Sequence, residues 1–368
     1  MIMLAGEWQN FKSVVLRAEA AGELMPKWQA LAANALESSG FNAPELVLPI
    51  LKQSRHTKLA TVQQAANLHF AIPIIGRGIY NTTWRKPFNA AGTPHLSEGL
   101  KEAALMAFLA AQTKPFLFKS IPTDGPFHQQ LKKQAARYRI LDSWERACLR
   151  PEGSYEDWLQ TNFDQKRRKE FKRQRNRLSE QGTLQTIALE KDAALDKFTQ
   201  DFLTLEASGW KGKKGTAINT DANMAKALRE SLAHLHAAGK LRFWSLMLNG
   251  KSIASLFAIV EGNQAWLGKI AYDENFAKFS PGALIILDCT QSFFAEPDII
   301  QIDSSAIPNH PLIDRIWRDR LAMISVFVGP ATLSRSRFIF IAAICKQKLK
   351  WRKKLRNIYY RVKGKAPS

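Results

Sequence analysis

A run of short apolar segments followed by a helix start constrains the fold of this chain more than any other feature. Three segments follow one another closely, at 241–248, 252–260 and 264–272. The first two are separated by Asn249-Gly250, a dipeptide typical of a two-residue hairpin turn. Apolar residues occupy both parities of these segments, which predicts a sheet covered on both faces and hence a layered α/β domain.

A helix start follows the third segment. Ser280 is a predicted N-cap, and Pro281 suits the first helical position because that position needs no N–H. Gly282 has no side chain to shield the next backbone amide, and such a helix start can bind a phosphate. An ordinary capped helix is the alternative interpretation. After the helix, one further strand is predicted to end at Asp303.

The order of these elements resembles that of the GNAT-type N-acyltransferases, and the amino-acid sequence of five segments resembles their FemAB/CelD-like branch. The matching segments are 169–182, 206–217, 250–254, 272–284 and 303–318. The segment 278–283 resembles the phosphate loop of simple GNAT enzymes only loosely. The resemblance implies two tandem GNAT-like domains with a cleft between them, and acyl-CoA, such as acetyl-CoA, as the co-substrate.

By this resemblance, the acyl-donor site lies in the second domain. The residues that the resemblance assigns to it are Tyr272, Lys278, Ser280, Pro281, Gly282 and Ala283. The domains are expected at residues 1–150 and 151–330, with a hinge near 149–155 and a basic amphipathic tail at 331–368.

The first 150 residues contain their own succession of helices and strands. Helices are predicted at 14–36, 97–111 and 127–136, and strands at 68–75, 79–84, 116–119 and 138–141. A similar order recurs in the second half, where a helix at 221–238 precedes the strands. Two copies of one α/β unit would explain this order.

The net charge of +21 is concentrated in two segments. Residues 331–368 hold 12 Lys and Arg and no acid, and residues 166–177 hold eight against one Glu, so the remaining chain is nearly neutral. The segment 166–177 is expected to form a helix that is either a solvated surface or a clamp for an anionic group. In the tail, apolar residues at near-helical spacing predict a helix that lies on an anionic membrane, docks on its own domain or binds RNA.

Two further features favour substrate contacts. Arg168 and Arg173 belong to the basic helix, and Trp210 and Lys211 stand in a glycine-rich loop of the kind that often binds ligands. For Trp210 the alternative is a cap on the apolar core.

Three residues are candidates for catalysis. Glu206 could remove the proton of an attacking amine, since a carboxylate with a raised pKa can act as a general base. Asp303 lies at the end of a predicted strand, where α/β folds often present functional groups, and His310 lies in a stiff loop between two prolines. The alternatives are a solvated helix residue for Glu206, a plain turn for Asp303 and an incidental loop histidine for His310. The next helix is expected to start with Asp314 and Trp317.

No metal-binding or disulfide pattern is expected. His234 and His236 point to different sides of a helix, and the three cysteines lack metal or redox spacing, as expected for reduced, buried thiols in a cytosolic protein. The N-terminus lacks the pattern of a signal peptide, and the longest apolar run near the C-terminus is too short to span a bilayer.

We therefore expect a cytoplasmic N-acyltransferase that moves an acyl group from acyl-CoA to an amine by direct attack on the thioester. By resemblance, the acceptor belongs to a polysaccharide, cell-envelope or lipid-linked precursor, and the tail keeps the enzyme at the inner face of the membrane. One alternative is a FemAB-like transferase that uses aminoacyl-tRNA. Another is a basic RNA- or membrane-binding protein on a degenerate acyltransferase fold.

Overall fold

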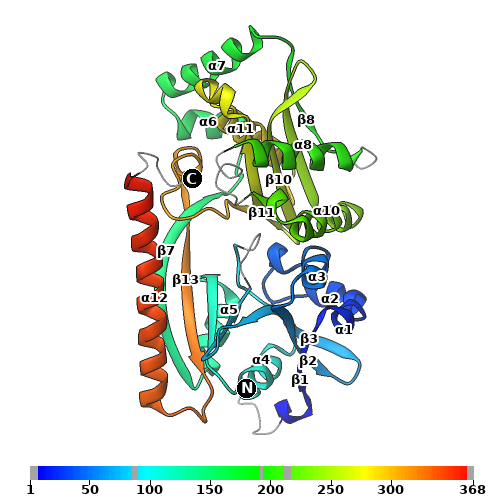
Figure 1. Cartoon of the computed structure of the whole chain (residues 1–368), viewed down its shortest axis with the longest axis vertical. Coiled ribbons are helices and arrows are strands. Elements are labelled where there is room, and N and C mark those ends of the chain that lie inside the picture. The colour runs from blue at the N-terminus through cyan, green and yellow to red at the C-terminus, as the bar shows by residue number, and fades with distance from the viewer. Residues whose placement is uncertain (1–6, 85–89, 191–193, 210–216, 363–368) are drawn as a thin grey trace. The chain divides into compact units, whose positions relative to one another are not determined.

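The computed structural model describes residues 7–84, 90–190, 194–209 and 217–362, without the side chains of 353 and 356–362. The chain forms two compact units (Figure 1). The first comprises residues 1–145 with 321–367, and the second comprises 146–320. The first unit is therefore built from both ends of the chain.

The first unit is a mixed sheet with helices on it. Its strands are β1 (Lys12–Leu16), β2 (Thr57–Gln64), β3 (Asn67–Gly76), β4 (Asn81–Thr83), β5 (His95–Leu96), β6 (Phe116–Pro122), most of β7 (Arg137–Leu149) and most of β13 (Asp319–Gly329). Its helices are η1 (Glu7–Asn10), α1 (Ala18–Gly22), α2 (Met25–Ala33), η2 (Gly40–Asn42), α3 (Pro44–Gln53), α4 (Lys101–Ala110), α5 (Pro126–Gln134) and α12 (Arg335–Val362). The strand order is β1-β2-β3-β4-β6-β13-β7, and β5 pairs with β3.

The second unit has the same kind of architecture. Its strands are β8 (Leu184–Ala188), β9 (Leu241–Leu248), β10 (Lys251–Glu261), β11 (Gln264–Tyr272) and β12 (Gln301–Asp303), and the end of β7 pairs with β12. Its helices are α6 (Tyr155–Asn162), α7 (Gln165–Ser179), α8 (Leu195–Ser208), η3 (Ile218–Thr220), α10 (Ala222–Ala237), η4 (Glu274–Phe279), α11 (Pro281–Phe294) and η5 (Ile313–Arg315).

Both units use one pairing scheme. Four strands pair antiparallel in chain order, β1 to β4 in the first unit and β8 to β11 in the second. A helix follows, α4 or α11, and the next strand returns parallel to the fourth, as β6 to β4 and as β12 to β11. An antiparallel strand then adds to the returning strand, β13 to β6 and β7 to β12. The expected tandem of two α/β units is therefore confirmed.

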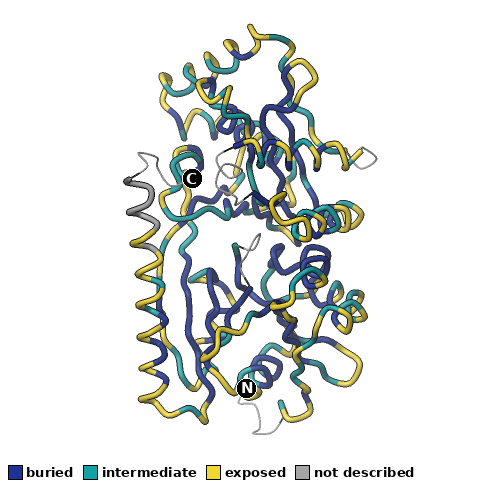
Figure 2. Tube along the Cα trace, in the orientation of Figure 1, coloured by how far each residue is buried: buried dark blue, intermediate teal, exposed yellow. Residues whose placement is uncertain are grey.

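The core of the second unit shows why its strands are apolar on both parities. On one face of the sheet, Trp244, Leu256 and residues of α11 belong to one buried cluster. On the other face, aromatic rings of β9 and β10 pack against α8, namely Phe243 and Phe257 with Phe198 and Phe202. Both faces are covered, as the sequence predicted, and Figure 2 shows the strands as the buried part of this unit.

Local sequence signals account for several element boundaries. Asn249 and Gly250 have positive φ angles of 51° and 76°, which confirms the predicted hairpin turn between β9 and β10. Asp164 accepts a hydrogen bond from the Arg167 amide and caps α7, and Asp221 caps α10 in the same way.

The long helix α12 docks on the first unit. Phe338, Ile341, Ala342 and Cys345 are buried against Tyr80, Leu117, Leu141 and Phe327. Docking on its own domain was one of the three uses considered for this segment. All three cysteines of the chain are free and buried. No helix in the described residues is both long and apolar enough to cross a bilayer.

Two predictions about secondary structure were wrong, and one predicted strand is longer than expected. The helix expected at 14–36 is a strand, β1, followed by α1 and α2. The strand expected at 138–141 extends over the 13 residues of β7. A helix was expected to begin near Asp314, but a single 3₁₀ turn and the strand β13 occupy that region.

Candidate functional site

The start of α11 is the geometric centre of the candidate site. Ser280 ends η4 and precedes α11 with φ 53° and ψ 49°, a left-handed conformation that costs a non-glycine residue about 1–3 kcal/mol. Its carbonyl accepts hydrogen bonds from the amides of Ala283 (2.8 Å) and Leu284 (3.2 Å). Pro281, Gly282 and Ala283 are buried, so the first turn of the helix lies inside the unit.

Gly282 is closely surrounded by side chains. A Cβ atom at this position would lie 3.2 Å from Leu312 Cδ2, 3.3 Å from Tyr272 Cδ1 and 3.6 Å from Ile270 Cδ1. Burial raises the pKa of Tyr272, and the nearby charge of Glu274 raises it further. The absence of a side chain at Gly282 therefore lets Leu312, Tyr272 and Ile270 pack closely against the first turn of α11.

The strand β11 presents a stretch of backbone next to this helix start. Its parallel pairing with β12 covers three residues, from Gln264 to Trp266, while the strand continues to Tyr272. Its register with β10 shifts opposite Phe257, and a Cβ at Gly268 would meet the Phe257 ring at 2.0 Å. This bulge lies between Leu267 and Ile270, just beyond the residues of β11 that pair with β12.

Glu206, at the end of α8, lies next to this region. Its side chain is 1% exposed, with Oε1 3.1 Å from Lys269 Nζ and Oε2 accepting a hydrogen bond from the Ile218 amide at 2.7 Å. Glu206 lines a small pocket of about 40 Å³ together with Ile270 and Tyr272, the residues that surround Gly282. The structure therefore brings Glu206 and the start of α11 to one place.

Asp303 lies at the end of β12, as expected, in a buried ion pair with Arg146. Its Oδ1 also accepts a hydrogen bond from the Ser305 amide (2.8 Å). Burial raises the pKa of Asp303, and the Arg146 guanidinium opposes that shift. These contacts fix the carboxylate between two strands, because Arg146 belongs to β7.

His310 holds the turn that follows β12. Its Nδ1 accepts hydrogen bonds from the amides of Leu312 (3.3 Å) and Ile313 (3.4 Å), at the start of η5. Those contacts require Nδ1 without a proton, so the proton of the neutral ring is on Nε2. His310 thereby positions Leu312, one of the side chains around Gly282.

The cations that the sequence suggested as ligand contacts each contact other groups of the protein. Arg168 donates hydrogen bonds to the carbonyls of Gln160 (3.1 Å) and Phe163 (2.8 Å) at the end of α6. Arg173 is exposed and pairs with Glu170, and Lys278 lies 4.9 Å from the centre of the Phe279 ring. Trp210 and Lys211 lie outside the described residues.

The structure adds two residues that the sequence did not single out. Lys269 and Arg146 each face a candidate carboxylate, and nothing in the local sequence indicates the pairing, since the partners are 63 and 157 residues apart. Within the described residues, no cluster of three or more His, Cys, Asp or Glu side chains could hold a metal ion.

Comparison with known families identifies the second unit. Residues 165–304 match the family model described as an acetyltransferase (GNAT) domain. The match spans β8 to β12 and includes Glu206, Gly282 and Asp303. Residues 165–304 therefore form a GNAT-type acetyltransferase domain, and the chain is an acyltransferase. No curated protein matches the sequence.

Several solved structures share the fold of nearly the whole chain. FemX has a TM-score of 0.56 and 8% identity, with 90% of this chain and 100% of FemX covered. The C-terminal domain of a putative lysylphosphatidylglycerol synthetase from Agrobacterium fabrum has a TM-score of 0.55 and 11% identity, with 88% and 96% covered. L-PGS from Bacillus licheniformis has a TM-score of 0.52 and 12% identity, with the same coverage. At these identities the likeness shows the fold alone.

Proposed function

Because residues 165–304 form a GNAT-type acetyltransferase domain, we propose that this protein is an N-acyltransferase whose acyl-CoA donor binds at the start of α11. The observation that carries the proposal is the glycine-lined helix start at Gly282 beside the bulged strand β11. A helix start offers backbone N–H groups and the positive end of its dipole to a phosphate. Here the N–H that remains is that of Gly282, because Pro281 has none and the amides of Ala283 and Leu284 donate to the Ser280 carbonyl. The absence of a side chain at Gly282 brings the backbone of this first turn close to Tyr272, which lines the small pocket together with Glu206.

The chemistry requires no nucleophile from the protein. The amine of the acceptor attacks the thioester carbonyl, an N–C bond forms, the C–S bond breaks and coenzyme A leaves as a thiolate. Backbone N–H groups of β11 beyond Trp266 stabilise the negative charge on the carbonyl oxygen. Glu206 takes the proton of the amine, because it lies beside the residues that surround Gly282.

Asp303 and His310 have supporting roles in this proposal. Asp303 is held by Arg146 and fixes the end of β12, and His310 orients the turn that places Leu312 over Gly282. The acceptor amine belongs to a polysaccharide, cell-envelope or lipid-linked precursor, as the FemAB/CelD-like resemblance implies.

Titration of CoA against Gly282 variants tests the donor site. A methyl group at Gly282 would meet only the ends of side chains, at 3.2 Å or more, so Gly282→Ala is expected to fold. We expect it to weaken CoA binding about tenfold, and Gly282→Val to weaken it further. Gly99→Ala is the control, since nothing lies within 4 Å of a Cβ there. Unchanged CoA affinity in both Gly282 variants, with unchanged circular dichroism, would refute the assignment.

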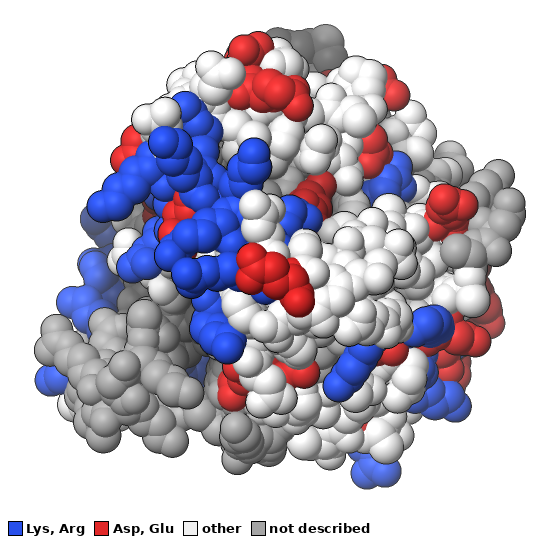
Figure 3. Space-filling model, turned by 90° about the horizontal axis from the view of Figure 1, so that it is seen from above, with Lys and Arg blue, Asp and Glu red and all other residues white. Residues whose placement is uncertain are grey.

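A second candidate function is transfer from an aminoacyl-tRNA, as the FemAB-type resemblance implies. The observation that favours it is α7, which carries eight Lys and Arg. Arg173 and Arg175 pair with acids, whereas Lys166, Lys169 and Lys172 are exposed. Figure 3, seen from the end where α7 lies in Figure 1, shows Lys and Arg side chains gathered in one cluster. Such a surface suits a phosphate backbone.

A thermal-shift comparison separates the two donors. We expect acetyl-CoA or a longer acyl-CoA to raise the melting temperature of the full chain, because a ligand that binds only the folded state stabilises it. Charged tRNA is the parallel sample. Stabilisation by tRNA together with no response to any acyl-CoA would replace the preferred donor with the second one.

We also propose that α12 rests on an anionic membrane. Its outer face carries a stripe of exposed apolar side chains, Phe340 (66%), Ile344 (41%), Trp351 (53%) and Leu355 (59%). These positions fall within about 60° of one another around an ideal helix. Exposed cations flank the stripe, among them Arg337, Lys348, Lys350 and Lys354. An apolar stripe between rows of cations suits the boundary between anionic headgroups and acyl chains.

Vesicle sedimentation tests this contact. The full chain is expected to sediment with vesicles that contain phosphatidylglycerol and to remain in solution with pure phosphatidylcholine. Phe340→Ser/Leu355→Ser should lose most of this binding, because both side chains are exposed and support no packing in the unit. Val15→Ser/Ile140→Ser, at exposed apolar positions elsewhere in the unit, is the control. Equal sedimentation of the two double variants would contradict a role for the stripe.

A further inference from the structure

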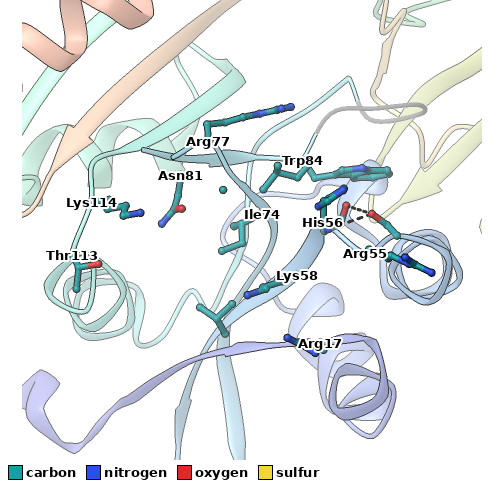
Figure 4. Close-up of a pocket in the computed structure, with 15 residues that line it drawn as sticks. Arg17, Arg55, His56, Lys58, Ile74, Arg77, Asn81, Trp84, Thr113 and Lys114 are labelled. Atoms are coloured by element: carbon teal, nitrogen blue, oxygen red, sulfur yellow. Dashed lines mark hydrogen bonds between the residues drawn. The ribbon is translucent and has the colours of Figure 1, made fainter. Parts of the chain in front are cut away.

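The first unit contains a large hollow in which positive charge accumulates. It has a volume of about 970 Å³, at the upper end of the range typical of ligand sites. Its lining includes five Lys and Arg side chains and one histidine, namely Arg17, Arg55, His56, Lys58, Arg77 and Lys114. Figure 4 shows these side chains around the hollow. No Asp or Glu is among the residues that line it in the described part of the chain.

The fold explains why a hollow exists here. Lys58 in β2 pairs directly with Ile74 in β3, so both side chains project from the same face of the sheet. Ile74 packs in the core beneath α4, but α4 ends at Ala110 and leaves the neighbouring part of that face uncovered. Thr113 and Lys114, just after the helix, form the opposite wall. The cations thus surround a recess instead of lying on a convex surface.

The walls of the recess are fixed by hydrogen bonds. Lys114 Nζ donates to the Gly78 carbonyl at 2.6 Å, and the Arg77 amide donates to the Tyr80 carbonyl at 2.8 Å, which together hold the turn between β3 and β4. Ser54 and Thr57 join through their hydroxyl groups at 2.8 Å. The buried Trp84 contributes to the lining. A ligand therefore meets a preformed site, which reduces the entropic cost of binding.

Within the described residues, no carboxylate forms an ion pair with the cations of the recess. Cations gathered in a recess raise the local potential and attract anions. A single carboxylate would neutralise one of the five, whereas a di- or triphosphate offers several charges and many acceptor atoms, and arginine binds phosphate through two parallel hydrogen bonds.

We propose that this recess in the first unit binds a small molecule that carries a di- or triphosphate group. The site is separate in sequence and in structure from the donor site at α11, so the proposal goes beyond the proposed acyl transfer. A soluble nucleotide and the diphosphate end of a lipid-linked precursor share this chemistry.

Calorimetric titration of the full chain with inorganic pyrophosphate tests the site. We expect saturable binding by the wild type and at least about tenfold weaker binding by Lys58→Gln/Arg77→Gln, since each substitution removes a charge-assisted hydrogen bond. Lys27→Gln/Lys132→Gln removes the same charge from exposed positions of the same unit outside the recess and should bind within about twofold of the wild type. Equal pyrophosphate affinity in the two double variants, or no saturable binding by the wild type, would overturn the proposal.

Further titrations distinguish the source of the phosphate and separate this proposal from the acyl transfer. Tighter binding of a nucleoside diphosphate than of pyrophosphate indicates a soluble nucleotide, and tighter binding of a short-chain prenyl diphosphate indicates a lipid-linked ligand. Binding of tRNA with no binding of any diphosphate would reject the proposal. Gly282→Ala should bind pyrophosphate as the wild type does, and Lys58→Gln/Arg77→Gln should bind CoA unchanged, so either proposal can fail alone.

Discussion

Replacing Glu206 with Gln separates a catalytic role from a structural one. Glu206 is buried and bridges Lys269 Nζ (3.1 Å) and the Ile218 amide (2.7 Å). The substitution preserves the shape of the side chain and an oxygen that can accept from Ile218. It removes the negative charge opposite Lys269 and, with it, the carboxylate that we propose as the general base.

The expected effects differ in size for stability and for turnover. Removing one partner of a buried ion pair lowers the free energy of unfolding by about 3–5 kcal/mol. Lys269 is 23% exposed and can turn toward water, so we expect a loss of about 1–3 kcal/mol in the free energy of unfolding. Loss of a general base lowers kcat by about 10²–10⁴-fold.

A second substitution at Lys269 distinguishes the two causes. Glu206→Gln/Lys269→Met removes both charges, and replacing a whole buried pair is often close to neutral for stability. We expect urea unfolding to show most of the stability restored, while turnover with acetyl-CoA and a model amine stays at the level of the single variant. Recovery of turnover together with stability would show that Glu206 acts only as a structural anchor.

The same unit provides a matched control pair. Lys240 and Glu261 lie 3.3 Å apart and are 23% and 3% exposed, nearly the same as Lys269 and Glu206 at 23% and 1%. Glu261→Gln should therefore lose a similar amount of stability and Glu261→Gln/Lys240→Met should regain it, both with turnover per folded molecule unchanged.

The remaining predictions concern stability. Burial raises the pKa of Glu37 from 4.5 to about 7, so its contribution to the free energy of unfolding is full below pH 4.5 and is lost as the pH rises through 7. Glu37→Gln should remove up to about 3 kcal/mol of this pH dependence in urea unfolding. Arg146→Met leaves Asp303 buried without its cation and should lower the free energy of unfolding by about 3–5 kcal/mol. A much smaller decrease in Arg146→Met/Asp303→Leu would confirm that the unpaired carboxylate is the cause. Gly268→Ala places a Cβ 2.0 Å from the Phe257 ring and should lower the free energy of unfolding by about 1–3 kcal/mol; Phe257→Leu in the same chain should recover part of it, and an unchanged melting temperature in Gly268→Ala would contradict the bulge geometry.

Elements specified by local signals could be predicted from the sequence. The hairpin between β9 and β10 depends on two residues with positive φ, and Asn249-Gly250 is the dipeptide that adopts them most readily. The start of α11 was also predicted, because a proline at the first helical position is a local signal. The left-handed Ser280 was not predicted, since nothing in its neighbours requires that conformation.

Elements that depend on distant partners could not be predicted. β1 was taken as part of a helix because its strand character comes from pairing with β2, whose first paired residue lies more than 40 positions along the chain. β13 was missed for the same reason, since its partner β6 lies about 200 residues away. For both strands, tertiary context decided a segment whose local pattern was ambiguous.

Part of the candidate site could also be predicted from the sequence, and part of it could not. Gly282 and Glu206 were found from motif position, but their meaning depends on Leu312, Tyr272 and Lys269, which the fold brings to them. The cations of the recess in the first unit come from separate segments between residues 17 and 114, and only Arg55 and Lys58 among them lie close together in the sequence. The fold brings these charges together, so the recess could not be predicted from the sequence.

The pairing scheme also determines which fragments can be studied. A fragment of residues 1–150 would lack β13, which lies between β6 and β7 in the sheet of the first unit, and would leave two strand edges unpaired. A fragment beginning at residue 151 would lack the end of β7 and with it Arg146, so Asp303 would remain buried without its cation. Each unit thus depends on a strand contributed across the boundary suggested by sequence. Donor binding, the recess and the effect of each substitution must therefore be measured on the full chain.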